Sequence, residues 1–525
     1  MILGDITTRN ARKYPEKPAV IFDTTKYSFK EFNNRVNSLT NALTAMLVKK
    51  GDRVATLADN SSQYMEIYSA AAKGGMILVP LDTRLSRQGL SYIINNSGAK
   101  ALIVGKNYLE VINDIAQELK TVSHFIVIGQ DVEGMLDYEQ LVSSYPSDEP
   151  RVEVREDDLF CIMYTSGTTG LPKGVVISHK NKLTSAIDMI IMAHLRHDDV
   201  ALLVWPFSHS GLPWLMIAHQ LMGCTCVVLE KFEPKAILET IEKEKITMSV
   251  LAPSMIASLI GYPNVGKYDV SSLRWIMLGG TPLPMSQLKK AIELLGPIFS
   301  QIYGQTEACP IITCLPKEDY MLEGPPEKVR RLASCGKEVF SIEARVVDEE
   351  DNDVSPGQVG EIIAKGDNIM KGYWKLAQAT KETLKDGYLR TGDLATVDEE
   401  GYIYILDRKK DSILSGGESI YSVEIEEVLY RHPLVAEAAV IGVPNEELGE
   451  AVKAIVVLRK GIKASEREII EFCKQYLSPQ AIPKSVDFTD ELPRTAAGKV
   501  TKNILRERYG RKLGYQQRQK HPTQA

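Results

Sequence analysis

Short apolar strands alternate with amphipathic helices along much of the chain, and this alternation restricts the possible folds more than any other feature. Its clearest run comprises strands at 53–57, 76–81 and 101–104 and helices at 62–73 and 86–96. Parallel strands need a helix or another long connection between them, so this order predicts a parallel sheet with crossover helices. The alternation returns between residues 200 and 252, which predicts a second doubly wound α/β sheet.

The length of the chain predicts more than one domain. With 525 residues it exceeds what one ordinary hydrophobic core supports. Past residue 324, short strands separated by glycine turns predict a small β-rich subdomain, and a charge-dense segment, 407–411, follows it. Two helices and two strands beyond that segment predict a small α+β unit. We therefore expect an N-terminal domain, residues 1–409, and a C-terminal domain, residues 410–525.

Composition and charge exclude several classes of protein. Hydrophobic residues make up 44% of the chain and charged residues 25%, which excludes wholesale disorder. The net charge of −6 argues against a protein that holds nucleic acid by bulk electrostatics. Seven cysteines without a Cys-x-x-Cys pair indicate buried thiols in a reducing compartment. Because the first ten residues lack signal-peptide features and no apolar run approaches bilayer length, we expect a soluble cytoplasmic protein.

A loop rich in glycine and hydroxyl residues spans 164–174, between an apolar run and a β-branched run. Its sequence is Tyr-Thr-Ser-Gly-Thr-Thr-Gly-Leu-Pro-Lys-Gly. Backbone N–H groups and hydroxyls of such a loop can hold phosphate, and Lys173 adds a positive charge. It is not the P-loop NTPase signature, because neither Gly-Lys-Ser nor Gly-Lys-Thr occurs in it. On this stretch alone, a solvated surface loop remains the alternative.

Polar side chains follow two strands of the second series. His209 follows one strand, and Tyr303, Thr306 and Glu307 follow another. Open α/β sheets bind ligands beyond the carboxyl ends of their strands. An aromatic ring can stack on a base, a hydroxyl can bond phosphate and a carboxylate can hold Mg²⁺. A structural histidine in a tight turn and an ordinary Tyr-Gly turn are the alternatives.

Two residues in the second half of the chain predict no function by themselves. Asp393 lies in a glycine-containing loop, where its carboxylate could bond both hydroxyls of a ribose, although a turn-forming aspartate is the commoner reading. Lys499 follows Gly498 on an expected exposed turn, where lysines are usually solvated.

Taken in order, five stretches resemble the motifs of the adenylate-forming superfamily of acyl- and aryl-CoA synthetases, luciferases and peptide-synthetase adenylation domains. They are 164–174, 301–307, 388–393, 407–411 with 416–418, and 493–499. The resemblance implies a large N-terminal domain of doubly wound sheets with a β-rich subdomain, and a mobile α+β C-terminal domain that contains the catalytic lysine. It also implies a two-step reaction. A carboxylate attacks the α-phosphate of ATP, giving acyl-adenylate and pyrophosphate, and the thiol of coenzyme A then displaces AMP.

The resemblance assigns roles residue by residue. Attack of one anion on another requires charge neutralisation. Lys499 is expected to contact the carboxylate and the α-phosphate, Thr306 to bond the α-phosphate and Glu307 to hold Mg²⁺. The pyrophosphate half of ATP is expected to be enclosed by Thr165, Ser166, Gly167, Thr168, Thr169, Gly170 and Lys173. The remaining nucleotide contacts are expected from Gly280, Gln301, Tyr303, Gly304, Asp393 and Arg408.

The resemblance further implies a rotation of the C-terminal domain about Lys410 between the two half-reactions. Rotation would withdraw Lys499 and bring in a loop with Gly416 and Gly417, where the pantetheine arm of coenzyme A can pass close to the backbone. His209 matches a histidine near the acyl end of the pocket. The sequence departs from the family where Ser422 replaces a frequent proline, and where 480–482 lacks an aromatic and a cation that touch coenzyme A in some relatives.

We therefore predict an AMP-forming carboxylate–CoA ligase that uses ATP, Mg²⁺ and coenzyme A. Pocket walls are expected from 209–214, 277–280 and 305–310, and Trp214 favours an apolar acid of limited size, medium-chain, alicyclic or aromatic. The expected partners are these small molecules, without nucleic acid or a membrane span, and a homodimer is left open. The alternatives are a ligase that loads a carrier protein and a nucleotide-binding regulatory protein without turnover.

Overall fold

The computed structural model describes residues 1–165, 171–280, 283, 285–416, 418–494 and 500–509. By its internal contacts the chain forms two compact units. The large unit comprises 1–282, 287–344 and 364–389, and the small unit comprises 283–286, 345–363 and 390–525. The domain boundary at Lys410 remains a prediction.

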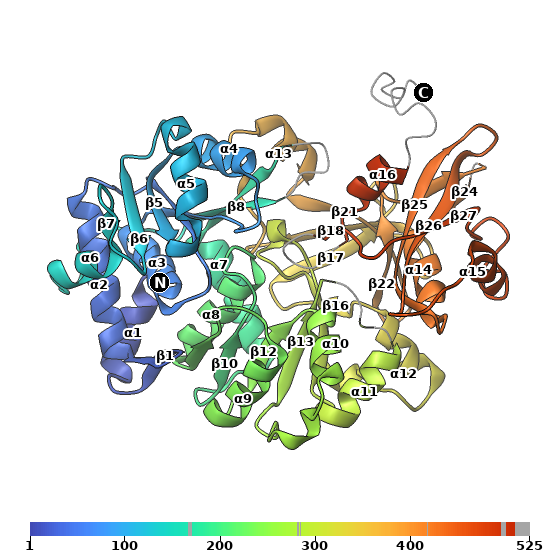
Figure 1. The fold of residues 1–525 in the computed structure, drawn as a ribbon, viewed down its shortest axis with the longest axis horizontal. Helices are drawn as coiled ribbons and strands as arrows, with labels where there is room; N and C mark the ends of the chain where they lie inside the picture. Colours follow the sequence, from blue (N-terminus) through green and yellow to red (C-terminus); the bar gives the residue numbers. More distant parts are fainter. Residues whose placement is uncertain (166–170, 281–282, 284, 417, 495–499, 510–525) are drawn as a thin grey trace. The chain divides into compact units, whose positions relative to one another are not determined.

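A nine-stranded sheet of the large unit contains the second series of strands (Figure 1). Its order is β16-β15-β14-β13-β12-β10-β11-β1-β2, and β10 to β14 pair in parallel. The strands are β1 (Pro18–Phe22), β2 (Thr25–Ser28), β10 (Val200–Leu203), β11 (Thr225–Val228), β12 (Met248–Leu251), β13 (Trp275–Gly279), β14 (Phe299–Tyr303), β15 (Thr313–Leu315) and β16 (Lys337–Glu338). Crossovers between them are α8 (Gly211–Met222), α9 (Pro234–Glu244), α10 (Pro253–Gly261) and α11 (Met285–Leu295).

An eight-stranded sheet contains the first series, and its order is β19-β9-β8-β4-β3-β5-β6-β7. The predicted parallel alternation is confirmed, since β3 pairs in parallel with both β4 and β5. The strands are β3 (Arg53–Leu57), β4 (Ile77–Pro80), β5 (Ala99–Gly105), β6 (His124–Ile128), β7 (Leu136–Asp137), β8 (Leu159–Thr165), β9 (Lys173–Ser178) and β19 (Gly372–Tyr373). The helices are α1 (Asp5–Lys13), α2 (Phe29–Ala45), α3 (Ser62–Gly74), α4 (Arg87–Ser97), α5 (Leu109–Ile115), α6 (Tyr138–Ser144) and α7 (His179–Met192).

Serine caps determine where several of these helices begin. The side chains of Ser28, Ser61, Ser86 and Ser178 each accept a hydrogen bond from a backbone N–H of the first turn. Such caps stabilise a helix by about 1 kcal/mol, because they satisfy a donor that has no partner within the helix. Ser178 starts α7 directly after β9, so the chain that leaves the glycine-rich loop runs through one strand into a well-capped helix.

The small unit has a core of its own under the hairpin of β25 (Val435–Asn445) and β26 (Gly449–Leu458). The sheet around this hairpin has the order β24-β23-β26-β25, with β27 (Ser485–Phe488) beside β26. Its other elements are β23 (Ile413–Ser415), β24 (Glu418–Ile420), α14 (Ser422–Arg431), α15 (Glu466–Cys473) and α16 (Lys502–Tyr509). The short strands predicted past residue 324 form a separate sheet, which is not confined to one unit. Its strands are β17 (Ile342–Val347), β18 (Gly360–Gly366), β21 (Tyr388–Val397) and β20 (Leu384–Lys385), with β22 (Ile403–Arg408) beside β21.

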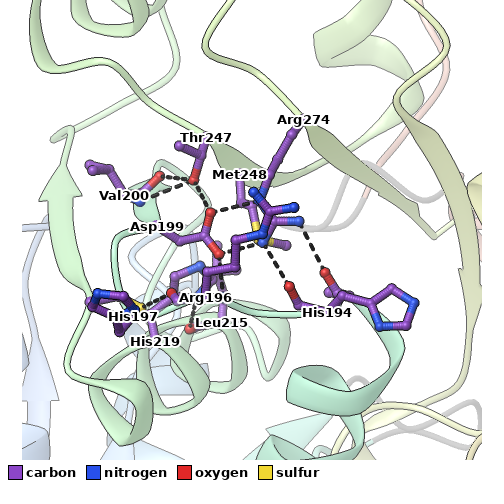
Figure 2. Close-up of polar contacts among 12 residues, drawn as sticks. His194, Arg196, His197, Asp199, Val200, Leu215, His219, Thr247, Met248 and Arg274 are labelled. Atoms are coloured by element: carbon purple, nitrogen blue, oxygen red, sulfur yellow. Dashed lines mark hydrogen bonds and ion pairs between the residues drawn. The ribbon is translucent and has the colours of Figure 1, made fainter.

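A buried ion pair joins the amino ends of three strands in the nine-stranded sheet. Asp199 precedes β10, Thr247 precedes β12 and Arg274 precedes β13. The Nε of Arg274 donates to Oδ1 of Asp199 at 2.7 Å, its Nη2 donates to Oδ2, and Thr247 Oγ1 donates to Oδ1 at 2.8 Å (Figure 2). The same guanidinium donates to the carbonyls of Ala193 and His194 at 3.1 and 3.2 Å. This network fixes the edge of the sheet opposite to the carboxyl ends of β10 to β14.

All seven cysteines are buried free thiols, as the composition predicted. Within the described residues, no helix combines the length and the apolar character that a membrane span needs.

Candidate active site

The carboxyl ends of neighbouring parallel strands bring several predicted site residues to one edge of the nine-stranded sheet. The chain leaves β10 for the turn that contains His209, leaves β13 at Gly280 and leaves β14 for the loop 303–307. Because β10, β12, β13 and β14 run parallel and adjacent, these three segments lie along the same edge. Gly280 has a φ of 99°, a backbone conformation that favours glycine.

His209 is half-buried and stands edge-on to the ring of Trp205. Their ring centroids are 4.7 Å apart with an interplanar angle of 82°. The Nδ1 of His209 accepts a hydrogen bond from the N–H of Gly211 at 3.2 Å, so the neutral ring carries its proton on Nε2. A Cβ on Gly211 would lie 2.9 Å from the Trp205 ring, and glycine therefore permits this close packing.

The loop after β14 holds two of the predicted catalytic groups. Thr306 Oγ1 lies 3.5 Å from the hydroxyl of Ser210, which follows His209 in the chain. Glu307 is 9% exposed, and its Oε1 accepts a hydrogen bond from the hydroxyl of Tyr373 at 2.8 Å. The loop thus holds a hydroxyl beside the histidine turn and a largely buried carboxylate.

Glycine and a buried hydrogen bond shape the same loop. A Cβ on Gly304 would lie 2.1 Å from the carbonyl oxygen of Pro310, so only glycine fits there. Gln301 Oε1 accepts a hydrogen bond from the hydroxyl of Tyr320 at 3.5 Å. Tyr303 is half-buried at the last position of β14.

The glycine-rich loop is carried by the antiparallel hairpin of β8 and β9. Thr165 and Lys173 form the strand pair next to the loop, and Thr165 Oγ1 donates to the carbonyl of Lys173 at 3.5 Å. The ammonium of Lys173 lies 5.1 Å from the ring centroid of Tyr373, a cation–π contact. The other predicted pyrophosphate residues, Ser166, Gly167, Thr168, Thr169 and Gly170, lie outside the described residues.

Tyr373 therefore contacts both Lys173 and Glu307, which the sequence had placed in separate motifs. No sequence motif indicated Tyr373. Its only local signal is that two aromatic residues, Tyr373 and Trp374, directly follow Gly372. The structure brings the predicted phosphate-binding lysine and the predicted metal carboxylate to opposite parts of one tyrosine.

In the small unit, Asp393 and Arg408 are cross-strand partners in β21 and β22. Arg408 Nε lies 3.2 Å from Oδ1 of Asp393, whose side chain is largely buried. The N–H of Asp393 donates to Thr391 Oγ1 at 3.1 Å. An oriented carboxylate with a guanidinium beside it can accept hydrogen bonds from sugar hydroxyls.

The remaining predicted residues of the small unit follow β22. Desolvation and the positive charge of Arg408 lower the pKa of Lys410 below its ordinary value. Gly416 has a φ of 60°, and its N–H donates to the carbonyl of Leu448 at 2.9 Å. Gly417 and Lys499 lie outside the described residues.

Ser422, where the family often has proline, makes contacts that proline cannot make. Its N–H and its hydroxyl both donate to Oδ2 of Asp407, at 2.6 and 2.7 Å. Proline has no N–H, so it would lose the first bond. The departure from the family pattern thus replaces a rigid helix start by a hydrogen-bonded one.

One expected pocket wall belongs to the core. Trp214 is fully buried, and its indole N–H donates to the carbonyl of Ser185 at 2.7 Å. A ring without accessible surface offers none to a ligand, so the prediction that Trp214 lines the acid pocket is wrong. Met277 is fully buried as well.

The described side chains fit Mg²⁺ in one way. Among the described residues, no three His, Cys, Asp or Glu side chains form a metal-binding group. Nucleotide enzymes usually hold Mg²⁺ through one or two carboxylates and the substrate phosphates, rather than in a cage of protein ligands. A single carboxylate such as Glu307 is compatible with that arrangement.

Comparisons with known proteins agree with this geometry. Residues 7–374 match the family model of the AMP-binding enzyme, and residues 424–499 match that of the AMP-binding enzyme C-terminal domain. The chain is 35% identical over 509 residues to a feruloyl-CoA synthase of Amycolatopsis sp., covering 97% of this chain and 99% of that protein. It is 33% identical over 516 residues to a long-chain-fatty-acid–CoA ligase of Mycobacterium tuberculosis, covering 97% and 98%.

A solved structure gives the same result for the fold. ATP-bound MatB from Rhodopseudomonas palustris matches with a TM-score of 0.88 at 29% identity, covering 97% of this chain and 99% of that one. Together with the matched family models and the five motifs in their order along the chain, this identifies the chain as a member of the AMP-binding enzyme family, an AMP-forming carboxylate–CoA ligase of the adenylate-forming superfamily.

Proposed function

We propose that this ligase activates an apolar carboxylic acid of limited size, medium-chain, alicyclic or aromatic, at the carboxyl edge of β10 to β14. The observation that supports this choice is an apolar surface beside His209. Trp205 donates its indole N–H to Met255 Sδ at 3.1 Å, and a Cβ on Gly279 would lie 3.4 Å from both Trp205 and Ile302. Met255 and Ile302 are half-buried, so they keep surface that an apolar ligand can cover.

In the first half-reaction, cations and hydrogen-bond donors would offset the repulsion between the carboxylate and the triphosphate. Lys499 would contact the carboxylate and the α-phosphate, and Thr306 would bond the same phosphate. Lys173 and the glycine-rich loop would hold the pyrophosphate that leaves. Glu307 would hold Mg²⁺, which supplies positive charge to the phosphate oxygens. The bond between the α- and β-phosphates breaks as the carboxylate oxygen bonds to the α-phosphorus.

In the second half-reaction, the thiol of coenzyme A attacks the acyl carbon and AMP leaves. Asp393 and Arg408 would hold the ribose of the nucleotide, with Tyr303 on its adenine. Rotation about Lys410 would exchange Lys499 for the loop of Gly416, which gives the thioester chemistry access to the same acyl group. We further propose that the enzyme acts in the cytoplasm, where ATP and coenzyme A are both present.

A panel of acids tests the substrate class. Pyrophosphate release would be measured with straight chains from acetate to palmitate, with cyclohexanecarboxylate and with benzoate and cinnamate. We expect the highest kcat/KM for the medium-chain or ring acids. Turnover of long chains alone would refute the proposal. Formation of the thioester with free coenzyme A, followed by mass spectrometry, separates this function from the loading of a carrier protein.

Two variants test where the acid lies. Met255→Ala should shift the preferred acid toward a longer or wider one, because it removes most of one apolar wall. Met46→Ala, at a half-buried methionine directly after the end of α2, is the matched control and should leave the preference unchanged. An unaltered acid profile in Met255→Ala would remove Met255 from the site.

A further inference from the structure

Residues 368–374, here called the strap, connect the hairpin of the glycine-rich loop to the loop after β14. On one side, the N–H of Trp374 donates to the carbonyl of Gly174 at 2.7 Å. On the other side, the N–H of Met370 donates to the carbonyl of Glu307 at 2.8 Å. The strap is thus hydrogen-bonded to both of the loops that are expected to handle the phosphates of ATP.

Side-chain amides anchor the first half of the strap. Asn368 Nδ2 donates to the carbonyls of Ala308 and Ile311, at 2.9 and 3.0 Å. Asn181, in the first turn of α7, donates from Nδ2 to the carbonyl of Ile369 at 2.8 Å. These bonds are buried, so they hold the strap in one position relative to the two loops.

Tyr373 extends from the strap to the charged groups of both loops. Its hydroxyl donates to Glu307 Oε1 at 2.8 Å, and its ring lies under the ammonium of Lys173 at 5.1 Å. The N–H of Tyr373 donates to Thr380 Oγ1 at 2.9 Å, which fixes the backbone from which the ring projects. Among the described residues, no group donates a hydrogen bond to the second carboxylate oxygen of Glu307.

We propose that Tyr373 is a positioning residue, whose hydroxyl holds the Glu307 carboxylate in the orientation that binds Mg²⁺ and whose ring seats Lys173 beside the phosphates. A carboxylate that is held by one oxygen presents the other to a metal, and removal of such an outer partner typically costs 10–100-fold in metal affinity or activity. The inference rests on the proposed role of Glu307 in Mg²⁺ binding.

The large unit contains a matched control with the same three chemical groups. Tyr388 donates its hydroxyl to Glu343 Oε1 at 2.7 Å, and Lys365 lies 5.3 Å from the centroid of its ring. Glu343 is exposed and belongs to β17 rather than to a loop at the carboxyl edge of the parallel strands. Loss of the Tyr388 hydroxyl thus removes an equivalent tyrosine–glutamate bond without a change at Glu307.

The experiment measures ATP binding by calorimetry on the full chain, once in EDTA and once at saturating Mg²⁺. The readout is the dissociation constant of ATP in EDTA divided by the dissociation constant of ATP at saturating Mg²⁺. A larger ratio means that Mg²⁺ strengthens ATP binding more. Tyr373→Phe keeps the ring under Lys173 and loses only the hydroxyl, so we expect the ratio to fall about tenfold while the metal-free affinity stays within twofold. Tyr373→Leu also removes the ring, and its metal-free affinity should fall about two- to fivefold, as loss of a cation–π contact predicts. Tyr388→Phe should match the parent in both conditions.

Glu307→Gln distinguishes a failure of the proposed Mg²⁺ ligand Glu307 from a failure of the proposed role of Tyr373. If this variant keeps the parent's ratio, Glu307 does not hold Mg²⁺ and the proposed function is wrong at this residue. If the ratio falls in Glu307→Gln but stays at the parent's value in Tyr373→Phe, only the inference about Tyr373 is overturned. A Tyr373→Phe variant that loses affinity equally with and without Mg²⁺ overturns it as well. The melting temperature of each variant shows whether it is folded.

Discussion

Replacement of Arg274 by methionine should destabilise the large unit by about 3–5 kcal/mol at pH 7. The carboxylate of Asp199 is 2% exposed and would lose both bonds from the guanidinium, so a negative charge would stay buried without its ionic partner. Thr247 Oγ1, at 2.8 Å, and the N–H of Arg196, at 2.7 Å, would remain as donors to Asp199. These two bonds place the expected loss toward the lower end of the range.

The double variant Asp199→Asn with Arg274→Met tests the cause. It removes the buried charge together with its partner, so it should be more stable than Arg274→Met alone. Equal instability of the single and double variants would refute the argument, because the loss would then come from packing. Lys245→Met, which breaks the exposed pair of Lys245 with Asp269, is the control and should leave the unfolding midpoint unchanged.

A lower pH should reduce the difference in the free energy of unfolding between the parent and Arg274→Met. Burial by itself raises the pKa of Asp199, but hydrogen bonds from Arg274 and the Arg196 amide outweigh it and hold the pKa below its ordinary value. The pair therefore stabilises the parent above the unfolded-state pKa of about 3.9, and this contribution is lost as the pH falls through the folded-state pKa. In the variant, fewer hydrogen bonds oppose the effect of burial on Asp199, so this carboxylate becomes protonated at a higher pH than in the parent. Protonation removes the cost of the buried unpaired charge.

Tryptophan fluorescence during urea unfolding measures these differences in unfolding free energy for the large unit alone. The four tryptophans of the chain all belong to the large unit. They are Trp205, Trp214, Trp275 and Trp374. Trp275 directly follows Arg274, so its emission reports the sheet edge at which the ion pair lies. Unfolding of the small unit does not enter this signal directly.

Three further predictions concern the site. Asp393→Asn should weaken AMP binding about tenfold or more in calorimetry, since a neutral amide replaces a charged acceptor, and unchanged binding would contradict the ribose assignment. Lys410→Pro should keep pyrophosphate release but slow thioester formation, since proline stiffens the proposed pivot, and equal loss of both steps would argue against a rotation. Gly304→Ala should lower the melting temperature and ATP affinity, since its Cβ would lie 2.1 Å from the Pro310 carbonyl, whereas Gly261→Ala, with no atom within 4 Å, should change neither.

Local patterns predicted the strands and helices well where the apolar periodicity was strong. The strand expected over 53–57 is β3, Arg53–Leu57. The polar and acidic segment 132–155 gave no such signal, but it contains β7 and α6. Only three residues of α6 are buried, Tyr138, Leu141 and Val142, and that is too few to produce a clear periodicity.

The site was predictable only in part, because some of its contacts join distant parts of the chain. The order of the motifs indicated the nucleotide site, and strand topology explains why His209 and Thr306 lie on one edge. Tyr373 was missed because its partner Glu307 is 66 residues away in the sequence. Trp214 was misplaced because proximity to His209 in the sequence does not reveal that α8 is buried along most of its length.

In the nine-stranded sheet, the residues proposed to contact the acid and the ion pair that stabilises the sheet lie at opposite ends of the strands. Met255 and Ile302 adjoin the turns at one edge, while Asp199 and Arg274 bind each other at the other, a strand length away. Mutations at well-separated positions have nearly independent effects on folding free energy. With the acid at the first edge, as proposed, changes of acid preference would arise there without loss of the stability that the second edge provides.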